Sequence, residues 1–123
     1  MRIRLVGCLM VFLGSFSGAA FAHHSFASFD MKKEVRISGT VGEMQYTNPH
    51  AWLFVDVPTA NGATESWGIE LGSQNLLIRG GWLADTVKVG MKVVVTIHPM
   101  RDTSKRGGSL ISIVLPNGRV IRG

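Results

Sequence analysis

Four histidines carry the most specific chemistry in this sequence, and two of them, His23 and His24, are adjacent. They directly follow Ala20-Phe21-Ala22, which has the small-x-small form that signal peptidase cleaves. Cleavage after Ala22 makes His23 the first residue of the mature chain. A terminal histidine is chemically unusual, because its free amine and its Nδ1 atom can hold one metal ion together in a chelate ring.

A terminal histidine of this kind predicts copper as the metal. Its amine and Nδ1, with one further imidazole, form a three-nitrogen set that resembles the histidine brace of secreted copper proteins. Three nitrogens without a thiolate suit Cu(II) best among the divalent first-row ions, and Zn(II) less well. His50 or His98 is expected as the third ligand, with His24 as an alternative. The competing interpretation is that all four histidines are ordinary residues of a terminus, a turn and a strand end.

The segment before the cut has the parts of a secretory signal peptide. A short positive start at Arg2 and Arg4 is followed by a nearly unbroken apolar run over residues 5–16. That run is too short to be a convincing membrane span, and no second apolar run follows it. We therefore expect residues 1–22 to be a signal peptide and residues 23–123 to form one exported, periplasmic domain.

Composition limits the class of the mature protein. Roughly 100 residues are enough for one modest hydrophobic core. The single cysteine, Cys8, lies in the signal peptide, so neither a disulfide nor a thiolate ligand is expected; lipidation at Cys8 is the less favoured alternative. The net charge of +5 for the whole chain falls when Arg2 and Arg4 are removed, and the mild basic excess that remains suits a small anionic ligand or a glycan. An exported protein meets little nucleic acid, so none is expected as a partner.

Apolar residues of the mature chain follow the period of strands. Val35, Ile37 and Val41 alternate, and the apolar phase then slips at Gly42-Glu43, which predicts one long strand with a bulge. An Asn-Gly pair at residues 61–62 predicts a hairpin. Further strands are expected at residues 52–57, 65–71, 93–98 and 110–115, with a short piece at residues 119–121. The predicted core has these members: Val35, Ile37, Val41, Leu53, Val55, Val57, Trp67, Ile69, Leu71, Val93, Val95, Ile97, Ile111 and Ile113.

One short helix is predicted between the third and fourth strands. Ser73 can cap it, Leu76 and Leu77, with Ile78, give it a small apolar face, and Gly80-Gly81 ends it. Three strands, a short helix and two strands, with a bent first strand, are typical of a five-stranded OB-like barrel, an all-β fold. A small open meander with one helix packed on it is the alternative.

Several motifs resemble a known family. "AHHSFASFD", "YTNPHAW", "ELGS" and "RGGW" are together similar to bacterial secreted proteins classed as domain of unknown function 6152, whose mature chains open His-His-Ser-Phe. The resemblance runs from His23 to about Gly118. It implies an exported single-domain protein and brings no activity with it.

The OB fold itself predicts where a ligand binds. Such barrels use the face of the second and third strands, together with the loops that join strands one and two and strands four and five. His50 and His98 fall on those two loops. Other candidate ligand-binding residues are Trp52, Trp67, Arg101, Lys105 and Arg106. For the tryptophans a place in the core or at its rim is the favoured interpretation, and for the basic loop a solvated surface.

These observations lead to three hypotheses. We expect a periplasmic protein that binds Cu(II) through His23. The alternative is a metal-free module that binds an oligosaccharide, a lipid or a protein through Trp52, Trp67 and the basic loop. A small copper oxidase or oxygenase ranks last, because the sequence shows no substrate pocket. No catalytic residues are predicted, since the sequence has no recognisable nucleophile and base arrangement.

Overall fold

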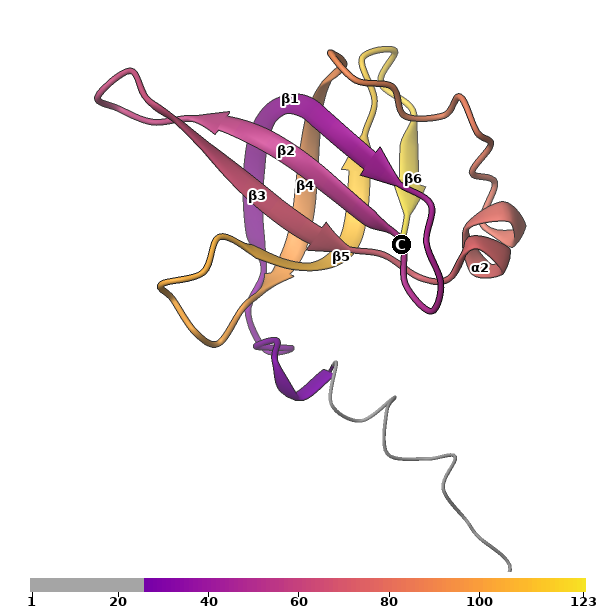
Figure 1. The fold of residues 1–123 in the computed structure, drawn as a ribbon, viewed down its shortest axis with the longest axis horizontal. Coiled ribbons are helices and arrows are strands. Elements are labelled where there is room, and N and C mark those ends of the chain that lie inside the picture. Colours follow the sequence, from indigo (N-terminus) through magenta and orange to yellow (C-terminus); the bar gives the residue numbers. More distant parts are fainter. Residues whose placement is uncertain (1–25) are drawn as a thin grey trace, which may run out of the picture.

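The computed structural model describes residues 26–123, so the predicted signal peptide, Cys8, His23 and His24 lie outside the described residues. Six strands and one helix of the described part follow one another along the chain (Figure 1). They are β1 (Val35–Gln45), β2 (Trp52–Pro58), β3 (Thr64–Glu70), α2 (Gln74–Arg79), β4 (Lys92–Pro99), β5 (Gly107–Val114) and β6 (Val120–Arg122). Within residues 26–123, no helix is long and apolar enough to span a bilayer.

The strands form one sheet that closes on itself. Its order is β3-β2-β1-β4-β5-β6, and β3 also pairs with β5, so five strands make a barrel while β6 extends one edge. The closing pair is parallel and sets Gly68 opposite Gly107. A Cβ atom at Gly107 would overlap the carbonyl oxygen of Gly68, so only glycine allows this approach. The predicted OB-like barrel, with its helix between β3 and β4, is confirmed.

The first strand bends so that it serves both sides of the barrel. Its first half pairs with β4 and its second half with β2, and the register shifts between Val41 and Glu43. The bulge therefore falls at the predicted slip. Gly39 is also required near the bend, because a Cβ there would overlap the carbonyl oxygen of Asp56 on β2.

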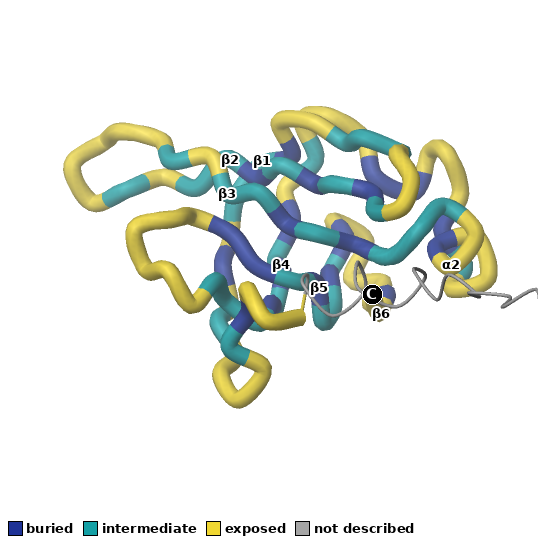
Figure 2. Tube along the Cα trace, turned by 60° about the horizontal axis from the view of Figure 1, so that its bottom comes forward, coloured by how far each residue is buried: buried dark blue, intermediate teal, exposed yellow. Residues whose placement is uncertain are grey.

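Most of the predicted core is buried. Leu53, Val55, Ile69, Val95 and Ile97 are fully inaccessible to solvent, and Figure 2 shows buried and partly exposed residues alternating along the strands, as the pleat requires. Val35, Val57 and Trp67 are only partly buried but pack against this core.

Ile111 was assigned to the core, and this prediction is wrong. The β4–β5 register shifts between Thr96 and Ile97, so that Ile97 faces Leu110 and Thr96 faces Ser112. Ile111 is then the extra residue of a bulge, and Leu110 is buried in its place. Pairing with β4 thus determines which side chains of β5 face the core.

The predicted helix exists, but its apolar face is smaller than predicted. The Ser73 hydroxyl accepts a hydrogen bond from the Leu76 backbone N–H, as a cap should. Only Leu77 is buried, whereas Leu76 and Ile78 are 60% and 64% exposed. The end of the barrel is filled instead by Trp82, 1% exposed, which follows the helix.

Two Ile→Ala substitutions test this core. Ile69→Ala should lower the free energy of unfolding by about 2 to 5 kcal/mol, because it removes a fully buried side chain and leaves a cavity. Ile78→Ala is the matched control and should change it by no more than about 0.5 kcal/mol, because Ile78 is exposed. Urea unfolding of both variants measures the difference, and equal losses would contradict the core described above.

Candidate functional site

His50 ends the loop between β1 and β2, and that loop is tied to the end of β3. Ala51 makes two backbone hydrogen bonds to the residues after β3: its N–H donates to Gly72 O at 3.0 Å, and its carbonyl oxygen accepts from Leu71 N–H at 2.9 Å. The imidazole lies beside β3, where its Nδ1 is 3.2 Å from the Leu71 carbonyl oxygen and 3.2 Å from Glu70 Oε1. The ring is thereby fixed by two neighbours on one strand end.

These two neighbours decide which ring nitrogen of His50 can bind a metal. A carbonyl oxygen and a carboxylate oxygen only accept hydrogen bonds, so Nδ1 carries the proton and donates it. The lone pair then belongs to Nε2. Histidines that bind metals in proteins use this arrangement, in which the other ring N–H donates to a carboxylate or a backbone carbonyl.

His98 is held in the same way at the end of β4. Its Nδ1 is 2.9 Å from the carbonyl oxygen of Lys33 and donates to it, which leaves the lone pair on Nε2. Lys33 belongs to a turn that Asp30 stabilises, since Lys33 N–H donates to Asp30 O at 3.0 Å. Loss of solvent opposes ionisation of the Asp30 carboxyl, but hydrogen bonds from Lys32 and Lys33 outweigh it and lower the pKa of Asp30. The turn therefore keeps its charged carboxylate at neutral pH.

The chain before β1 is anchored next to His98. Phe29 is only 3% exposed and forms a bridge with Met100, just beyond β4. Arg101 fixes the preceding residues, because its backbone N–H donates to Ser28 O at 2.9 Å and its Nε donates to Ala27 O at 3.1 Å. We call residues 26–30 the N-terminal arm. Phe29 therefore pins this arm to the barrel, whereas Phe26 is 61% exposed.

One cavity brings the arm and both described histidines together. Its volume is about 590 Å³. It is lined by Phe26, Phe29, Met31, His50, Glu70, Leu71, Gly72, Leu76, His98, Ser109, Leu110, Ile111, Arg122 and Gly123. Among residues 26–123, no three His, Cys, Asp or Glu side chains form a group that could hold a metal ion. The residues described at this cavity therefore include two imidazoles but no group of three such ligands.

The two candidate tryptophans lie on opposite faces of the sheet. Trp67 faces Val55, which is fully buried, so its ring points inward and packs on the core. Arg106 lies against that ring, with its guanidinium carbon 5.9 Å from the centroid. Trp52 points outward and is paired with Glu70. The structure does not combine the two tryptophans into one stacking surface.

The cations of the predicted basic loop have partners within the chain. Arg101 holds the N-terminal arm, Lys105 is 4.0 Å from Asp102, and Arg106 Nε donates to Glu65 Oε2 at 3.0 Å. The loop ends at Arg106, because β5 begins at Gly107. The three cations therefore stabilise the loop and the N-terminal arm through contacts within the chain.

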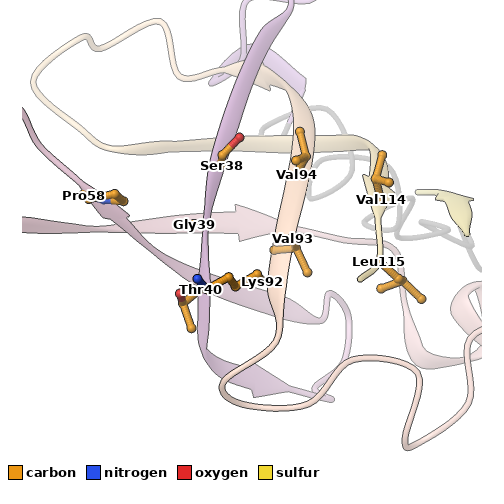
Figure 3. Close-up of a pocket in the computed structure, with 9 residues that line it drawn as sticks. All are labelled: Ser38, Gly39, Thr40, Pro58, Lys92, Val93, Val94, Val114 and Leu115. Carbon is orange, nitrogen blue, oxygen red and sulfur yellow. The ribbon is translucent and has the colours of Figure 1, made fainter. Parts of the chain in front are cut away.

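A second cavity, of about 380 Å³, lies between β1, β4 and the end of β5 (Figure 3). It is lined by Ser38, Gly39, Thr40, Pro58, Lys92, Val93, Val94, Val114 and Leu115. Lys92 is its only ionisable side chain, and no His, Asp or Glu lines it. Its chemistry is unsuited to a metal cation.

Glu70 is the site residue that sequence reasoning missed. The sequence places it on the third strand beside Glu65, and strand parity showed only that these two carboxylates do not form a pair. Its contact with His50 depends on how the β1–β2 loop returns to the end of β3, which is a tertiary feature. The signal that could have found it is the position of both residues on the predicted ligand edge of an OB-like barrel.

Comparison with known proteins places the chain in a family. It belongs to the family described as "Family of unknown function (DUF6152)", whose sequence model matches residues 11–109. No curated protein matches the sequence.

Two solved forms of Rim1, a mitochondrial single-stranded DNA-binding protein from S. cerevisiae, have a similar fold. The first is 15% identical over 68% of this chain and 92% of Rim1, with a TM-score of 0.54, and the second is 18% identical over 74% and 97%, with a TM-score of 0.50. Such low identities show a shared fold alone.

Arg101→Ala tests the anchoring of the N-terminal arm. Removal of the guanidinium deletes its hydrogen bond to Ala27 O, so protection of the arm against hydrogen exchange should fall about threefold to tenfold. Lys105→Ala is the matched control from the same loop and should leave that protection unchanged. Backbone amide exchange at residues 27–30 measures both effects, and equal protection in the two variants would show that Arg101 does not hold the arm.

Proposed function

We propose that this protein is an exported, periplasmic protein that binds Cu(II) through the amine and Nδ1 of a mature N-terminal His23. The observation that supports this proposal is the cavity lined by Phe26, His50 and His98. The arm therefore leads from the side of the barrel on which both imidazoles lie. An arm anchored on the opposite side would have made convergence impossible.

Chain length allows the terminus to reach this cavity. His23 stands three positions before Phe26, and an extended chain of that length spans roughly 10 Å. Because Phe26 lines the same cavity as both imidazoles, this length supports an approach of the His23 nitrogens to one of them. Metal–imidazole distances of about 2.0 to 2.1 Å would then complete a three-nitrogen site.

His50 is the stronger candidate for the third ligand. Both histidines leave Nε2 with the lone pair, but only His50 also has a carboxylate, Glu70, at its Nδ1. A carboxylate partner orients the ring and raises the basicity of the ligating nitrogen. Nitrogen ligands without thiolate favour Cu(II) by ligand type and by the order of divalent affinities.

A single glycine placed before His23 tests the chelate directly. It converts the amine into an amide while every side chain stays in place, so affinity for Cu(II) should fall at least about tenfold, or roughly 1.4 kcal/mol. His24→Ala should weaken binding far less. The protein should be secreted from a Gram-negative host, shown by intact mass to begin at His23, and titrated with Cu(II).

Three results would contradict the proposal. A mature chain that begins elsewhere lacks the histidine amine, and unchanged affinity after the added glycine shows that the amine is not a ligand. Full affinity for Cu(II) in both His50→Ala and His98→Ala would show that neither imidazole is the third nitrogen ligand. Each of these results favours the metal-free binding module, whereas oxygen consumption by the copper-loaded protein with a reductant would favour the oxidase.

Glu70→Gln tests the support that His50 receives. The neutral amide orients the ring less strongly than the carboxylate, so affinity for Cu(II) should fall by about tenfold, at the lower end of the usual effect of such groups. Glu65→Gln is the matched control on the same strand, since Glu65 contacts Arg106 instead. Titration of both variants with Cu(II) compares them, and equal affinities would assign the third ligand to another residue.

A further inference from the structure

The outer face of β2 carries a pair of stacked aromatic rings. Trp52 and Phe54 alternate with the fully buried Leu53 and Val55, so their side chains point away from the core. Their ring centroids are 6.5 Å apart and the ring planes differ by 23°. Both residues are half-buried, and in Figure 1 the layer of β2 and β3 lies in front of β4 with no helix over it.

Polar residues flank these rings on both neighbouring strands. On β1, Gln45 faces Trp52 and Glu43 faces Phe54, and Gln45 Nε2 donates to Glu43 Oε1 at 2.7 Å. On β3, Glu70 faces Trp52. We define the aromatic platform by these residues: Glu43, Gln45, Trp52, Phe54, Gly68 and Glu70.

Gly68 gives the platform its flat centre. It faces Phe54 across the β2–β3 ladder. A Cβ atom at Gly68 would meet only Phe54, at 3.4 Å from Cε1, with nothing else within 4 Å. The ring of Phe54 therefore lies over the glycine backbone, and a larger side chain at this position would push against the ring.

The charge of this surface determines which ligands it can bind. The strand segments that form it, residues 40–45 together with β2 and β3, contain no lysine or arginine. The acidic residues with the outward parity of Trp52 and Phe54 are Glu43, Asp56 and Glu70, whereas Glu65 has the opposite parity and pairs with Arg106. Nucleic acid binding depends on cations that neutralise phosphates, and stacking platforms for single strands lie in positively charged grooves. This surface therefore disfavours a polyanion, although the fold is shared with a single-stranded DNA-binding protein.

We propose that the aromatic platform binds an uncharged oligosaccharide. The apolar face of a sugar ring packs on Trp52 and Phe54, as flat amphipathic ligands do on aromatic side chains. Glu43 and Glu70 accept hydrogen bonds from sugar hydroxyls, and the amide of Gln45 supplies both a donor and an acceptor. OB-like barrels bind oligosaccharides as well as oligonucleotides on this face, and the carboxylates select the former. The proposal does not depend on copper.

Indole N–H signals provide a direct test, because the protein has three tryptophans, at positions 52, 67 and 82. The full processed chain, labelled with ¹⁵N, is titrated with neutral hexasaccharides of β-linked glucose, α-linked glucose, N-acetylglucosamine, xylose and mannose. At least one should shift the Trp52 indole signal, while those of the inward-facing Trp67 and the buried Trp82 stay in place.

Variants separate the platform from the rest of the barrel. Trp52→Ala should weaken binding of the active sugar at least about tenfold, and Gly68→Val should weaken it by displacing Phe54. Trp67→Phe is the matched control and should bind as the unaltered protein does. The Trp67 and Trp82 signals report whether Trp52→Ala remains folded.

Two results would overturn this proposal. No shift of the Trp52 signal with any of the five sugars shows that the platform is not a sugar site. A shift produced by oligo(dT) and not by the sugars assigns the surface to nucleic acid. Neither result bears on the copper proposal, which is tested separately by the affinity for Cu(II).

Discussion

The parallel contact between β3 and β5 is the constraint on which the rest of the structure depends. Backbone meets backbone there, and the pairing sets Gly68 opposite Gly107 and Glu70 opposite Ser109. Closure brings the end of β3 beside the end of the β4–β5 loop, although these segments lie far apart in the sequence. Without it, His50 and His98 would occupy separate edges of an open sheet. The cavity that both line is thus a consequence of barrel closure.

Much of this fold could be predicted from sequence, because the strands keep a clear period of two. The slip at Gly42 marked the bulge, and Ser73 marked the start of the helix. Ile111 could not be placed in the same way, since a bulge in β5 is fixed by its pairing with β4. Trp82 was missed as a core residue because it follows the helix in a segment without periodicity, where only the open end of the barrel determines burial.

The site was predictable in part, for a related reason. Loop position in an OB-like barrel was enough to bring His50 and His98 to one edge. Strand parity also predicted that Trp67 points inward, and the structure adds that Trp52 points outward and lies on Phe54. Strand parity alone did not assign Glu70 to the site, because its contact with His50 arises where a loop meets a strand end. Side chains that act across such junctions have no fixed spacing along the chain.

Glu70 is shared by two surfaces, and this position has an energetic consequence. Its carboxylate contacts His50 Nδ1 at the cavity and also belongs to the outer face that carries Trp52. A group that hydrogen-bonds to Glu70 from the outer face draws electron density from the oxygen atoms that His50 meets. If both proposed sites bind their ligands, occupation of one would change the free energy of occupying the other, and thermodynamic linkage would require the two changes to be equal. One acid, whose side chain is only 12% exposed, thereby connects the cavity with the outer face of the barrel.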